Sequence, residues 1–393
     1  FRLRGVVCEE IKLAEKNRGD GRVRVGLVIL ELSRGGAEKA LFELATRLDR
    51  RRFEVVVYTI SGRARDMEES YLPALEARGI ETRNLGLRSV WGAPLALARL
   101  AKAFRRDHID VAQTFMYHAN ILGRVAGRLG GARLICAGIR VAERDGRFRL
   151  LIDRWTRFLC DAWICVGEST ARFTRETGRI PRSRVYSIPN GVSLDGLERR
   201  ATREGRRKRM IAIGRLCPQK GFDWLLTTYK SWLTPSTRRD WELWIVGAGE
   251  DREALERLCE EEGLGDFARF VGWRKDARDL LCESELFLLP SRWEGMANAL
   301  LEACAAGLPT LCMEVEGTRE VLGESSDDQI CAPGNAEEWG RKLERLTDDA
   351  ALRARLGARN RDRVAREFTL DGVARRYEDL WTRLLSERTR SNS

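Results

Sequence analysis

Short apolar runs alternate with amphipathic helical stretches along nearly all of this 393-residue chain, and this alternation limits the possible fold more than any other feature. Runs such as VRVGLVIL at 23–30 are apolar throughout, as strands buried on both faces of a parallel sheet are. A loop and a helical stretch follow each run, which is the order that builds βαβ units. We expect strands at 23–30, 53–59, 82–85, 109–114, 134–138 and 162–166, then at 210–213, 241–246, 268–271, 286–289 and 310–313.

These two series of strands predict an α/β protein with two doubly wound, Rossmann-like domains. The length agrees, because about 150 residues per domain would give two or three domains. The longest apolar runs have the length of a strand, so the sequence predicts no transmembrane helix. The first 22 residues are charged, lack an apolar signal core and do not begin with Met, as expected of a fragment or a processed chain.

One strand-to-helix stretch carries two acids beside a candidate anion site. The run LFLL at 286–289 is a predicted strand that Pro290 ends, and a helix is expected from about Asn298. The free N–H groups and positive dipole end of that helix favour a phosphate. Glu294 and Glu302 would repel a phosphate, so we expect them to accept hydrogen bonds from hydroxyls, which suggests a sugar nucleotide. Taken alone, this spacing also fits two ordinary solvated acids.

Three other loops after predicted strands hold candidate ligand-binding residues. Gly35 and Gly36 would let the backbone approach a ligand closely. Arg215 and Lys220, in the pattern R-x4-K, could hold a diphosphate between two cations. His118 follows a strand end, where open α/β sheets bind ligands. Each has an ordinary alternative: a common tight turn, a solvated basic loop and a structural histidine.

Composition argues against a metal or disulfide protein. Ten cysteines without a CxxC pair are typical of reduced thiols in a cytosolic protein. There are only two histidines and no D-x-D pair, so we expect neither a zinc site nor another metal, and no cofactor. Residues 1–200 hold 38 Lys and Arg against 24 Asp and Glu, a net +14; residues 201–393 hold 32 against 35, a net −3. The basic first half fits a nucleic acid, an anionic membrane surface or a phosphate-bearing substrate, or simply an arginine-rich composition.

Together, the motifs resemble those of the retaining family-4 glycosyltransferases, which have the GT-B fold. EGMANALLE at 294–302 is similar to the E-x7-E motif of that family. GGAE at 35–38, His118, IPNGV at 188–192 and the R-x4-K pattern agree with the family in order over roughly residues 23 to 385. The resemblance implies two domains that face a central cleft. These would be a charged N-terminal extension over 1–22, an acceptor-side domain over 23–196, a nucleotide-sugar-binding domain over 205–369, and a C-terminal helix over 370–386 that packs back on the first domain.

The resemblance also assigns roles to residues. Four are implied as catalytic: His118, Glu294, Arg215 and Lys220. The implied donor-binding residues are Gly35, Gly36, Arg215, Lys220, Gly272, Met296, Ala297, Asn298 and Glu302, with no metal ligand. In one place the chain departs from the pattern, because Glu316 stands where the family usually has the first glycine of a pair. This departure predicts a stiffer and more acidic loop.

The activity implied is metal-independent transfer of a sugar, with retention, from a UDP-sugar to an acceptor hydroxyl. The acceptor would be a cell-envelope polysaccharide or a lipid-linked glycan, and the enzyme would be cytoplasmic or peripheral on the inner face of the membrane. The helix expected over 95–106 is the candidate contact with anionic lipids. One alternative is a UDP-sugar 2-epimerase on the same fold. The other is a basic nucleic-acid-binding protein, against which the acidic second half and the lack of a recognised binding module argue.

Overall fold

The computed structural model describes residues 21–33, 35–61, 70–87, 92–141, 147–198, 207–233 and 240–392. Most of the charged extension (residues 1–20), Arg34 of the glycine loop and residues 199–206 of the expected linker lie outside these described ranges. The chain divides into two compact units, one of residues 1–137, 158–161 and 381–393 and the other of residues 138–157 and 162–380. No helix in the described ranges combines the length and the apolar character that crossing a bilayer requires.

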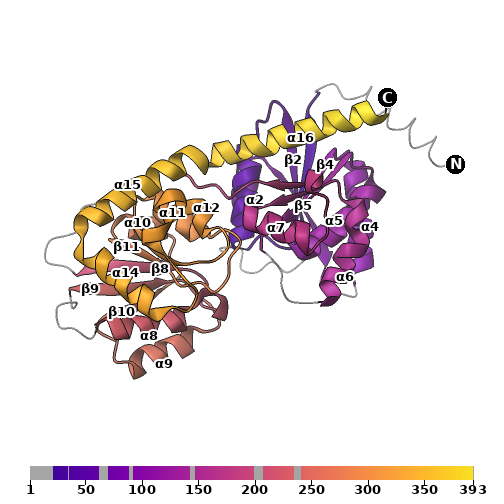
Figure 1. Cartoon of the computed structure of the whole chain (residues 1–393). Coiled ribbons are helices and arrows are strands. Elements are labelled where there is room, and N and C mark those ends of the chain that lie inside the picture. Colours follow the sequence, from indigo (N-terminus) through magenta and orange to yellow (C-terminus); the bar gives the residue numbers. More distant parts are fainter. Residues whose placement is uncertain are drawn as a thin grey trace. The chain divides into compact units, whose positions relative to one another are not determined.

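The first sheet has seven strands in the order β3-β2-β1-β4-β5-β6-β7 (Figure 1). Its strands are β1 (Val23–Ile29), β2 (Phe53–Ser61), β3 (Glu81–Leu87), β4 (Val111–Phe115), β5 (Leu134–Ile139), β6 (Ala162–Cys165) and β7 (Val185–Ser187). The connecting helices are α2 (Gly36–Arg47), α3 (Leu72–Glu76), α4 (Ala93–Arg106), α5 (Tyr117–Gly130), α6 (Arg147–Thr156) and α7 (Glu168–Glu176), with the 3₁₀ helices η3 (Arg157–Leu159) and η4 (Arg182–Arg184). β1 pairs in parallel with both β2 and β4. Because β2 lies on one side of β1 and β4 on the other, the strand order reverses between β1 and β4.

The second sheet has six strands in the order β10-β9-β8-β11-β12-β13. Its strands are β8 (Lys208–Ile213), β9 (Trp241–Val246), β10 (Ala268–Gly272), β11 (Leu286–Leu289), β12 (Thr310–Met313) and β13 (Ile330–Cys331). Its helices are η5 (Pro218–Lys220), α8 (Phe222–Leu233), α9 (Arg252–Glu261), α10 (Ala277–Cys282), α11 (Asn298–Ala305), α12 (Thr318–Leu322), η7 (Gly323–Ser325), α13 (Ser326–Gln329), α14 (Ala336–Asp348) and α15 (Ala350–Glu367). Here the order reverses between β8 and β11, which also pair in parallel.

Side-chain alternation along the second sheet separates two apolar layers. Phe287 and Leu289 of β11 belong to one buried cluster, which includes residues of α10, α11 and α12. Leu286 and Leu288 belong to the other cluster, with residues of α8, α9 and α14. Both faces of the strand are therefore covered, which explains why the whole run LFLL is apolar.

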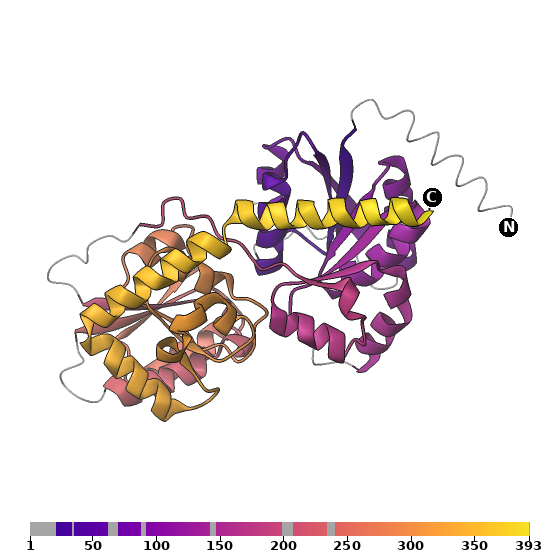
Figure 2. The same ribbon diagram turned by 45° about the horizontal axis from the view of Figure 1, so that its top comes forward.

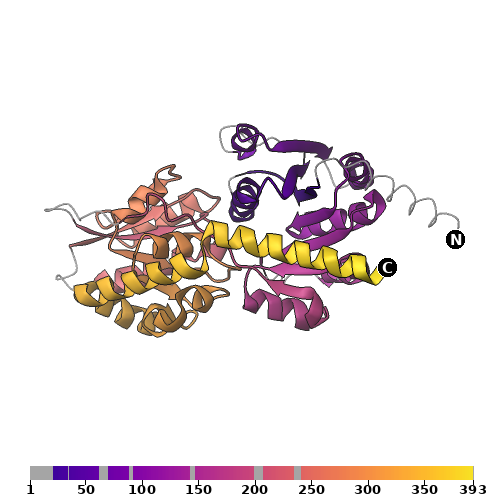
Figure 3. The same cartoon turned by 90° about the horizontal axis from the view of Figure 1, so that it is seen from above.

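The last helix, α16 (Leu370–Asn392), is a single unbroken helix (Figure 2; Figure 3). It ends six residues beyond the expected stretch 370–386. From Trp381 onward it belongs to the first unit, where the Trp381 and Phe53 ring centroids lie 6.1 Å apart. In the same unit Arg388 forms a 2.7 Å ion pair with Asp161.

The predicted fold class is confirmed, since both sheets are parallel and Rossmann-like. Predicted and observed strands mostly agree within two residues, as for β11, whose bounds are the predicted 286–289. Two short strands, β7 and β13, were not predicted. The boundaries assigned to an acceptor-side and a donor-side domain stay a prediction.

Candidate functional site

The reversal between β8 and β11 brings together the loops that follow these two strands. In open α/β sheets this is where a crevice forms at the carboxyl ends of the strands and where ligands bind. The loop after β8 carries Arg215 and Lys220, and the loop after β11 carries Glu294 and leads to α11. Four of the predicted site residues therefore lie in loops that follow neighbouring strands. Arg215 and Lys220 are in the first loop, and Glu294 and Met296 are in the second.

Lys220 and Glu294 form a direct ion pair within this unit. The Lys220 ammonium donates to Glu294 Oε1, and the two side chains are 20% and 8% exposed. The Ser291 hydroxyl donates to the same carboxylate oxygen at 2.8 Å. Because the ammonium compensates the buried carboxylate, Glu294 can lie beside a phosphate site without the full repulsion of an unpaired charge.

Several hydrogen bonds also join the two loops that carry this ion pair. The Arg292 amide donates to the Gln219 carbonyl at 2.8 Å, and Gln219 Nε2 donates to the Trp293 carbonyl at 2.9 Å. Arg292 Nη2 also lies 2.6 Å from Asp223 Oδ2. Burial alone would raise the pKa of Asp223, but the hydrogen bond from Arg292, the backbone hydrogen bonds and the charge of Arg292 together outweigh it, and the pKa is lowered. The loops thus support each other, which fixes the backbone on both sides of the Lys220–Glu294 pair.

Arg215 differs from Lys220 in its surroundings. Its side chain is exposed, and no hydrogen bond or ion pair holds it among the residues that the structure describes. A guanidinium without an internal partner beside a paired ammonium is available to an incoming anion.

The N-terminus of α11 is backed by a residue that the sequence reasoning missed. Met296 and Ala297 are each 6% exposed, and no side chain caps the helix at Ala297. Asn190 of the IPNGV segment is equally buried, and its Nδ2 donates to the Met296 carbonyl at 3.0 Å. Arg140 Nη2 in turn donates to Asn190 Oδ1. The sequence PNG indicates a turn, so only the buried position of Asn190 shows that it orients the loop before α11.

Gly295 explains why this loop can pass so close to the segment around Arg140. A Cβ on Gly295 would lie 1.8 Å from the Arg140 carbonyl oxygen, so any side chain would force the two backbones apart. Farther along α11, Glu302 is half-buried on the second turn, which is the position that the E-x7-E spacing indicated.

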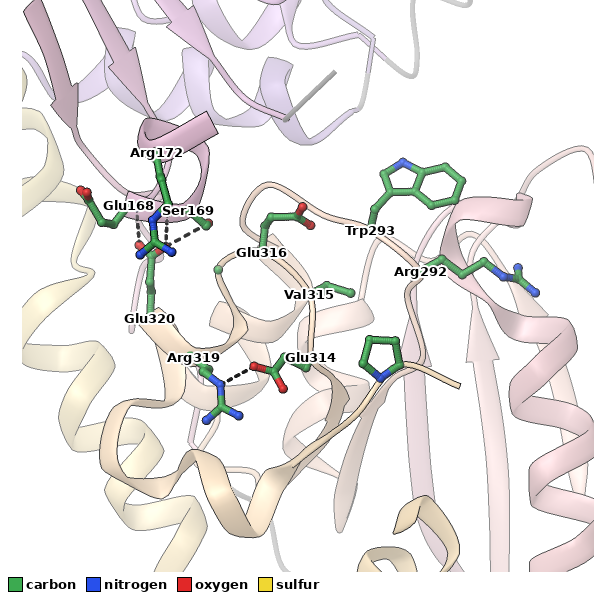
Figure 4. A pocket seen from close by; sticks show the side chains of 12 residues that line it. Glu168, Ser169, Arg172, Arg292, Trp293, Glu314, Val315, Glu316, Arg319 and Glu320 are labelled. Carbon is green, nitrogen blue, oxygen red and sulfur yellow. Dashed lines mark hydrogen bonds and ion pairs between the residues drawn. The ribbon is translucent and has the colours of Figure 1, made fainter. Parts of the chain in front are cut away.

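A cavity of about 640 Å³ opens beside this loop, and its lining residues all belong to the second unit (Figure 4). Trp293, which is 45% exposed, and Glu316 line it. Glu316 Oε2 lies 3.5 Å from the Glu294 amide, so the residue that departs from the family pattern adds a carboxylate beside Glu294. On another wall, the Glu320 carboxylate accepts from the Glu168 amide at 2.9 Å and caps α7. The loop is therefore more acidic, as predicted; its stiffness stays a prediction.

Gly272 lies at the end of β10 with φ +70°, a backbone conformation that favours glycine. Its carbonyl accepts from the Gly247 amide at 2.9 Å, so that carbonyl is already used inside the protein. The next residue, Trp273, is 42% exposed. A contact between a nucleotide base and Gly272 stays a prediction.

The strand reversal of the first sheet brings together the remaining predicted residues. Gly35 and Gly36 follow β1, and His118 follows β4, the strand beside it. The Glu38 carboxylate reaches back over Gly35, where a Cβ would lie 2.2 Å from Oε2. The Gly35 amide itself donates to the Ser33 carbonyl at 2.9 Å. His118 is exposed, and its ring meets that of Tyr117 edge-on at 5.4 Å.

Met116, just before His118, has φ 71° and ψ 162°. Few residues other than glycine adopt this conformation, which costs of the order of 1–3 kcal/mol. Such strain is often found where a chain holds a functional side chain in place. No pattern in the sequence indicated it, because the residue is a methionine.

No group of three or more His, Cys, Asp and Glu side chains with a geometry suited to a metal occurs in the described ranges. All nine described cysteines are free, and eight of them are buried. Burial raises the pKa of Cys165 to about 11, which keeps this thiol protonated near neutral pH.

Comparison with known proteins agrees with this architecture. Two family models match, one for "Glycosyltransferase Family 4" over residues 34–195 and one for "Glycosyl transferases group 1" over residues 207–349. The lipopolysaccharide core biosynthesis glycosyltransferase LpsE of Rhizobium meliloti is 27% identical over 352 residues, 88% of this chain and 95% of that protein. The chain matches half the length of LpsD, another such enzyme from the same organism, with 32% identity over 179 residues, which is 46% of this chain.

An Escherichia coli UDP-Gal:α-D-GlcNAc-diphosphoundecaprenol α-1,3-galactosyltransferase is 25% identical over 313 residues, 73% of this chain and 78% of that protein. Among solved structures, Anabaena HepE in complex with UDP and glucose has a TM-score of 0.79 at 16% identity, over 92% of this chain and all of that one. A glycosyltransferase from Rickettsia africae has a TM-score of 0.78 at 15% identity, over 93% and 99%.

The two parallel Rossmann-like sheets have the GT-B fold of these solved structures, and the family models and relatives identify the protein as a glycosyltransferase. The chain belongs to the glycosyltransferases that the group 1 and family 4 models describe. The 2-epimerase and nucleic-acid-binding alternatives are therefore set aside.

Proposed function

We propose that the protein transfers a sugar, with retention of configuration and without a metal ion, from a UDP-sugar to an acceptor hydroxyl. The observation that carries this proposal is the buried Lys220–Glu294 ion pair beside the N-terminus of α11, which no side chain caps, with Arg215 in the neighbouring loop exposed and without a partner among the residues that the structure describes. This arrangement offers cations and amides to a diphosphate and a carboxylate to a sugar, all from loops of one sheet.

The donor diphosphate would interact with Arg215, Lys220 and the first amides of α11. As the sugar–phosphate bond breaks, negative charge grows on the diphosphate, and fixed cations and amide dipoles stabilise it. In this proposal they do what a divalent metal does in other transferases. Glu302 would accept hydrogen bonds from the ribose hydroxyls. The choice of UDP is supported by the fold neighbour HepE, which was crystallised with UDP and glucose.

The sugar would lie against Glu294; a role for His118 stays a prediction of the family resemblance. Retention follows if the acceptor oxygen attacks the anomeric carbon on the face from which the diphosphate leaves. The bond from that carbon to the phosphate oxygen breaks, the bond to the acceptor oxygen forms, and the acceptor proton passes to the departing phosphate. Glu294 already accepts from Lys220 and Ser291, so in this proposal it orients the sugar and does not act as the base.

The acceptor would be a cell-envelope glycan or a lipid-linked sugar. The lipopolysaccharide core enzyme from Rhizobium meliloti and the galactosyltransferase for a diphosphoundecaprenol-linked sugar support this choice. Such acceptors are anchored in lipid, so the enzyme would work in the cytoplasm, at the inner surface of the membrane. The basic first half of the chain, +14 over residues 1–200, would favour an anionic bilayer.

A thermal-shift panel of UDP-, GDP- and ADP-sugars tests the donor. We expect UDP-sugars to raise the unfolding temperature most, because a ligand at 100 times its Kd stabilises the folded state by about 2.7 kcal/mol. A larger shift with a GDP- or ADP-sugar would contradict the choice of UDP. The stereochemistry is tested by NMR of the product anomer, and an inverted product would contradict retention.

A further inference from the structure

Two large aromatic side chains are more exposed than any other large apolar residue in the described ranges. Trp155 is 73% exposed and Phe158 is 71% exposed. They lie three residues apart on the continuous helical segment formed by α6 and η3, and this spacing places them on the same side of it. Two exposed rings on one helical face are unusual for a protein surface in contact only with water.

Arg154 and Arg157 are next to the two aromatic residues in the sequence. Arg154 is exposed, and no hydrogen bond or ion pair holds its side chain among the described residues. Arg157 Nη1 donates to the Arg179 carbonyl at 3.1 Å, so the turn after α7 lies against η3. Arg179 is also exposed. We call the five residues Trp155, Phe158, Arg154, Arg157 and Arg179 the aromatic–arginine patch.

The segment that carries the patch is strongly basic. Residues 147–184 contain nine arginines and four acids, a net charge of +5. Two of the four acids are already paired, Asp161 with Arg128 at 2.6 Å and Glu168 with Arg175. Asp153 is half-buried, which leaves Glu176 as an exposed acid of this segment that forms no ion pair within the described ranges. The acids of the segment are therefore too few to balance its arginines.

We propose that the aromatic–arginine patch binds the surface of an anionic lipid bilayer, with Trp155 and Phe158 inserted at the level of the head groups. Aromatic rings favour the boundary between water and acyl chains, while arginines beside them meet lipid phosphates. This proposal rests on the proposed function only in that a lipid-linked acceptor gives the enzyme a reason to reach the membrane.

The helix α4, which was the candidate from the sequence, is less suited to this role. Arg99 Nη1 donates to the Leu85 carbonyl at 2.8 Å, and Arg105 Nη2 donates to the Leu129 carbonyl at 2.7 Å. Arg106 is paired with Asp107 at 3.0 Å. Three of its four cations are thus bound within the protein. Its exposed apolar residue, Leu95, is 55% exposed and is not aromatic.

The experiment compares two double variants of the full chain in flotation with phosphatidylcholine vesicles that contain about one third phosphatidylglycerol. W155S/F158S should lose at least about tenfold in vesicle affinity, because the inserted area is removed. L95S/L129S, which removes two leucines that are each 55% exposed, is the matched control and should bind as the wild type does. The reverse pattern, or no binding by the wild type at low salt, would overturn the proposal.

Two further measurements test whether the rings enter the bilayer and whether the arginines meet its phosphates. Brominated lipid should quench the fluorescence of the wild type more than that of W155F, and equal quenching would mean that Trp155 does not enter the bilayer. R154Q/R179Q should weaken binding about fivefold for each charge removed and should reduce its salt dependence. If W155S/F158S instead converted a dimer to a monomer while vesicle binding stayed unchanged, the patch would be an interface between two copies and the proposal would fail.

The same variants distinguish this inference from the proposed function. W155S/F158S and R154Q/R179Q should both keep the thermal shift with UDP-sugars, because neither changes a residue of the loops after β8 and β11. If no UDP-sugar shift occurs in any form, the proposed donor is wrong, whatever the vesicle result. If the shift stays and vesicle binding does not depend on the rings, only the membrane proposal fails.

Discussion

The Lys220 ammonium donates to Glu294 Oε1 across 74 positions of sequence, and this contact joins charged side chains of the loops that follow two neighbouring strands. Each partner changes what the other can do. The carboxylate reduces the net charge that Lys220 offers to a diphosphate, while the ammonium compensates the buried carboxylate and orients it. The Lys220–Glu294 ion pair would therefore act as a whole, with the donor diphosphate on the lysine side and the donor sugar on the glutamate side.

Replacement of Lys220 by alanine should lower kcat by at least about 100-fold, in line with the loss of one fixed group that stabilises the transition state. The change also leaves Glu294 buried and unpaired, so folding must be checked by circular dichroism. The double variant K220M/E294Q removes both charges and serves as the control for that effect. A folded K220A enzyme with near wild-type kcat would show that Lys220 does not stabilise the leaving diphosphate.

Replacement of Glu302 by glutamine should raise the Kd for UDP about tenfold, because a hydrogen bond to a charged group contributes about 1.5–3 kcal/mol. Titration calorimetry with UDP measures this without any acceptor. E337Q, on the exposed start of α14, is the control and should bind UDP as the wild type does. An unchanged Kd for E302Q would remove Glu302 from the ribose site.

Transfer should continue in the presence of EDTA, because Arg215, Lys220 and the amides of α11 are proposed to neutralise the diphosphate. The measurement is the initial rate with a UDP-sugar and a lipid-linked acceptor, before and after chelation. Activity that disappears with EDTA and returns with Mg²⁺ or Mn²⁺ would contradict the metal-independent mechanism.

The apolar pattern was enough to predict both sheets, but it missed strands that are too short to show any pattern. β11 was predicted at its observed bounds because both faces of the strand are covered and all four residues are apolar. β13 has two residues, Ile330 and Cys331, which is too short to show any period. The fold class followed from the order of these runs, since repeated βα units permit few topologies.

Motif spacing proposed the candidate site only residue by residue. Arg215, Lys220, Glu294 and Glu302 were found through motif spacing, and the structure places the first three on adjacent loops and the fourth on α11. The Lys220–Glu294 contact could not be predicted, because it depends on β8 lying beside β11 and not on any local pattern. Asn190 was missed for the same reason. Its role appears only when Arg140 and Met296 are brought to either side of it.

Asp107 offers a test of stability against pH in the first unit. Its carboxylate accepts from the Tyr58 hydroxyl at 2.6 Å and from Arg83 at 2.9 Å. Burial alone would raise the pKa of Asp107, but the hydrogen bonds from Tyr58 and Arg106 and the charge of Arg83 outweigh it, and the pKa is lowered. Since the folded-state pKa lies below that of the unfolded chain, this contribution is complete above the unfolded value of about 3.9 and is lost as the pH falls through the folded value.

We therefore expect D107N to lower the free energy of unfolding by about 3 kcal/mol at pH 7, as breaking a buried charged cluster does. Y58F, which removes one hydrogen bond, should cost about 1 kcal/mol. Urea titrations at several pH values measure both. The gap between wild type and D107N should narrow below about pH 4, and a gap that widened on acidification would show that Asp107 is not held in its ionised form.

Gly221 should be the most sensitive glycine of the R-x4-K loop. It has φ +65°, and a Cβ there would lie 2.3 Å from the Pro290 carbonyl oxygen, so a side chain would be strained and would also push the loop after β8 away from the loop after β11. G221A should therefore separate Lys220 from Glu294 and reduce kcat by a factor similar to that of K220A. Gly265 is the matched control, because a Cβ there meets nothing within 4 Å and its φ is not positive. If G221A and G265A had the same activity, the close approach of these two loops would not be what positions Lys220, and the ion pair would have to be maintained by Gln219, Arg292 and Ser291 alone.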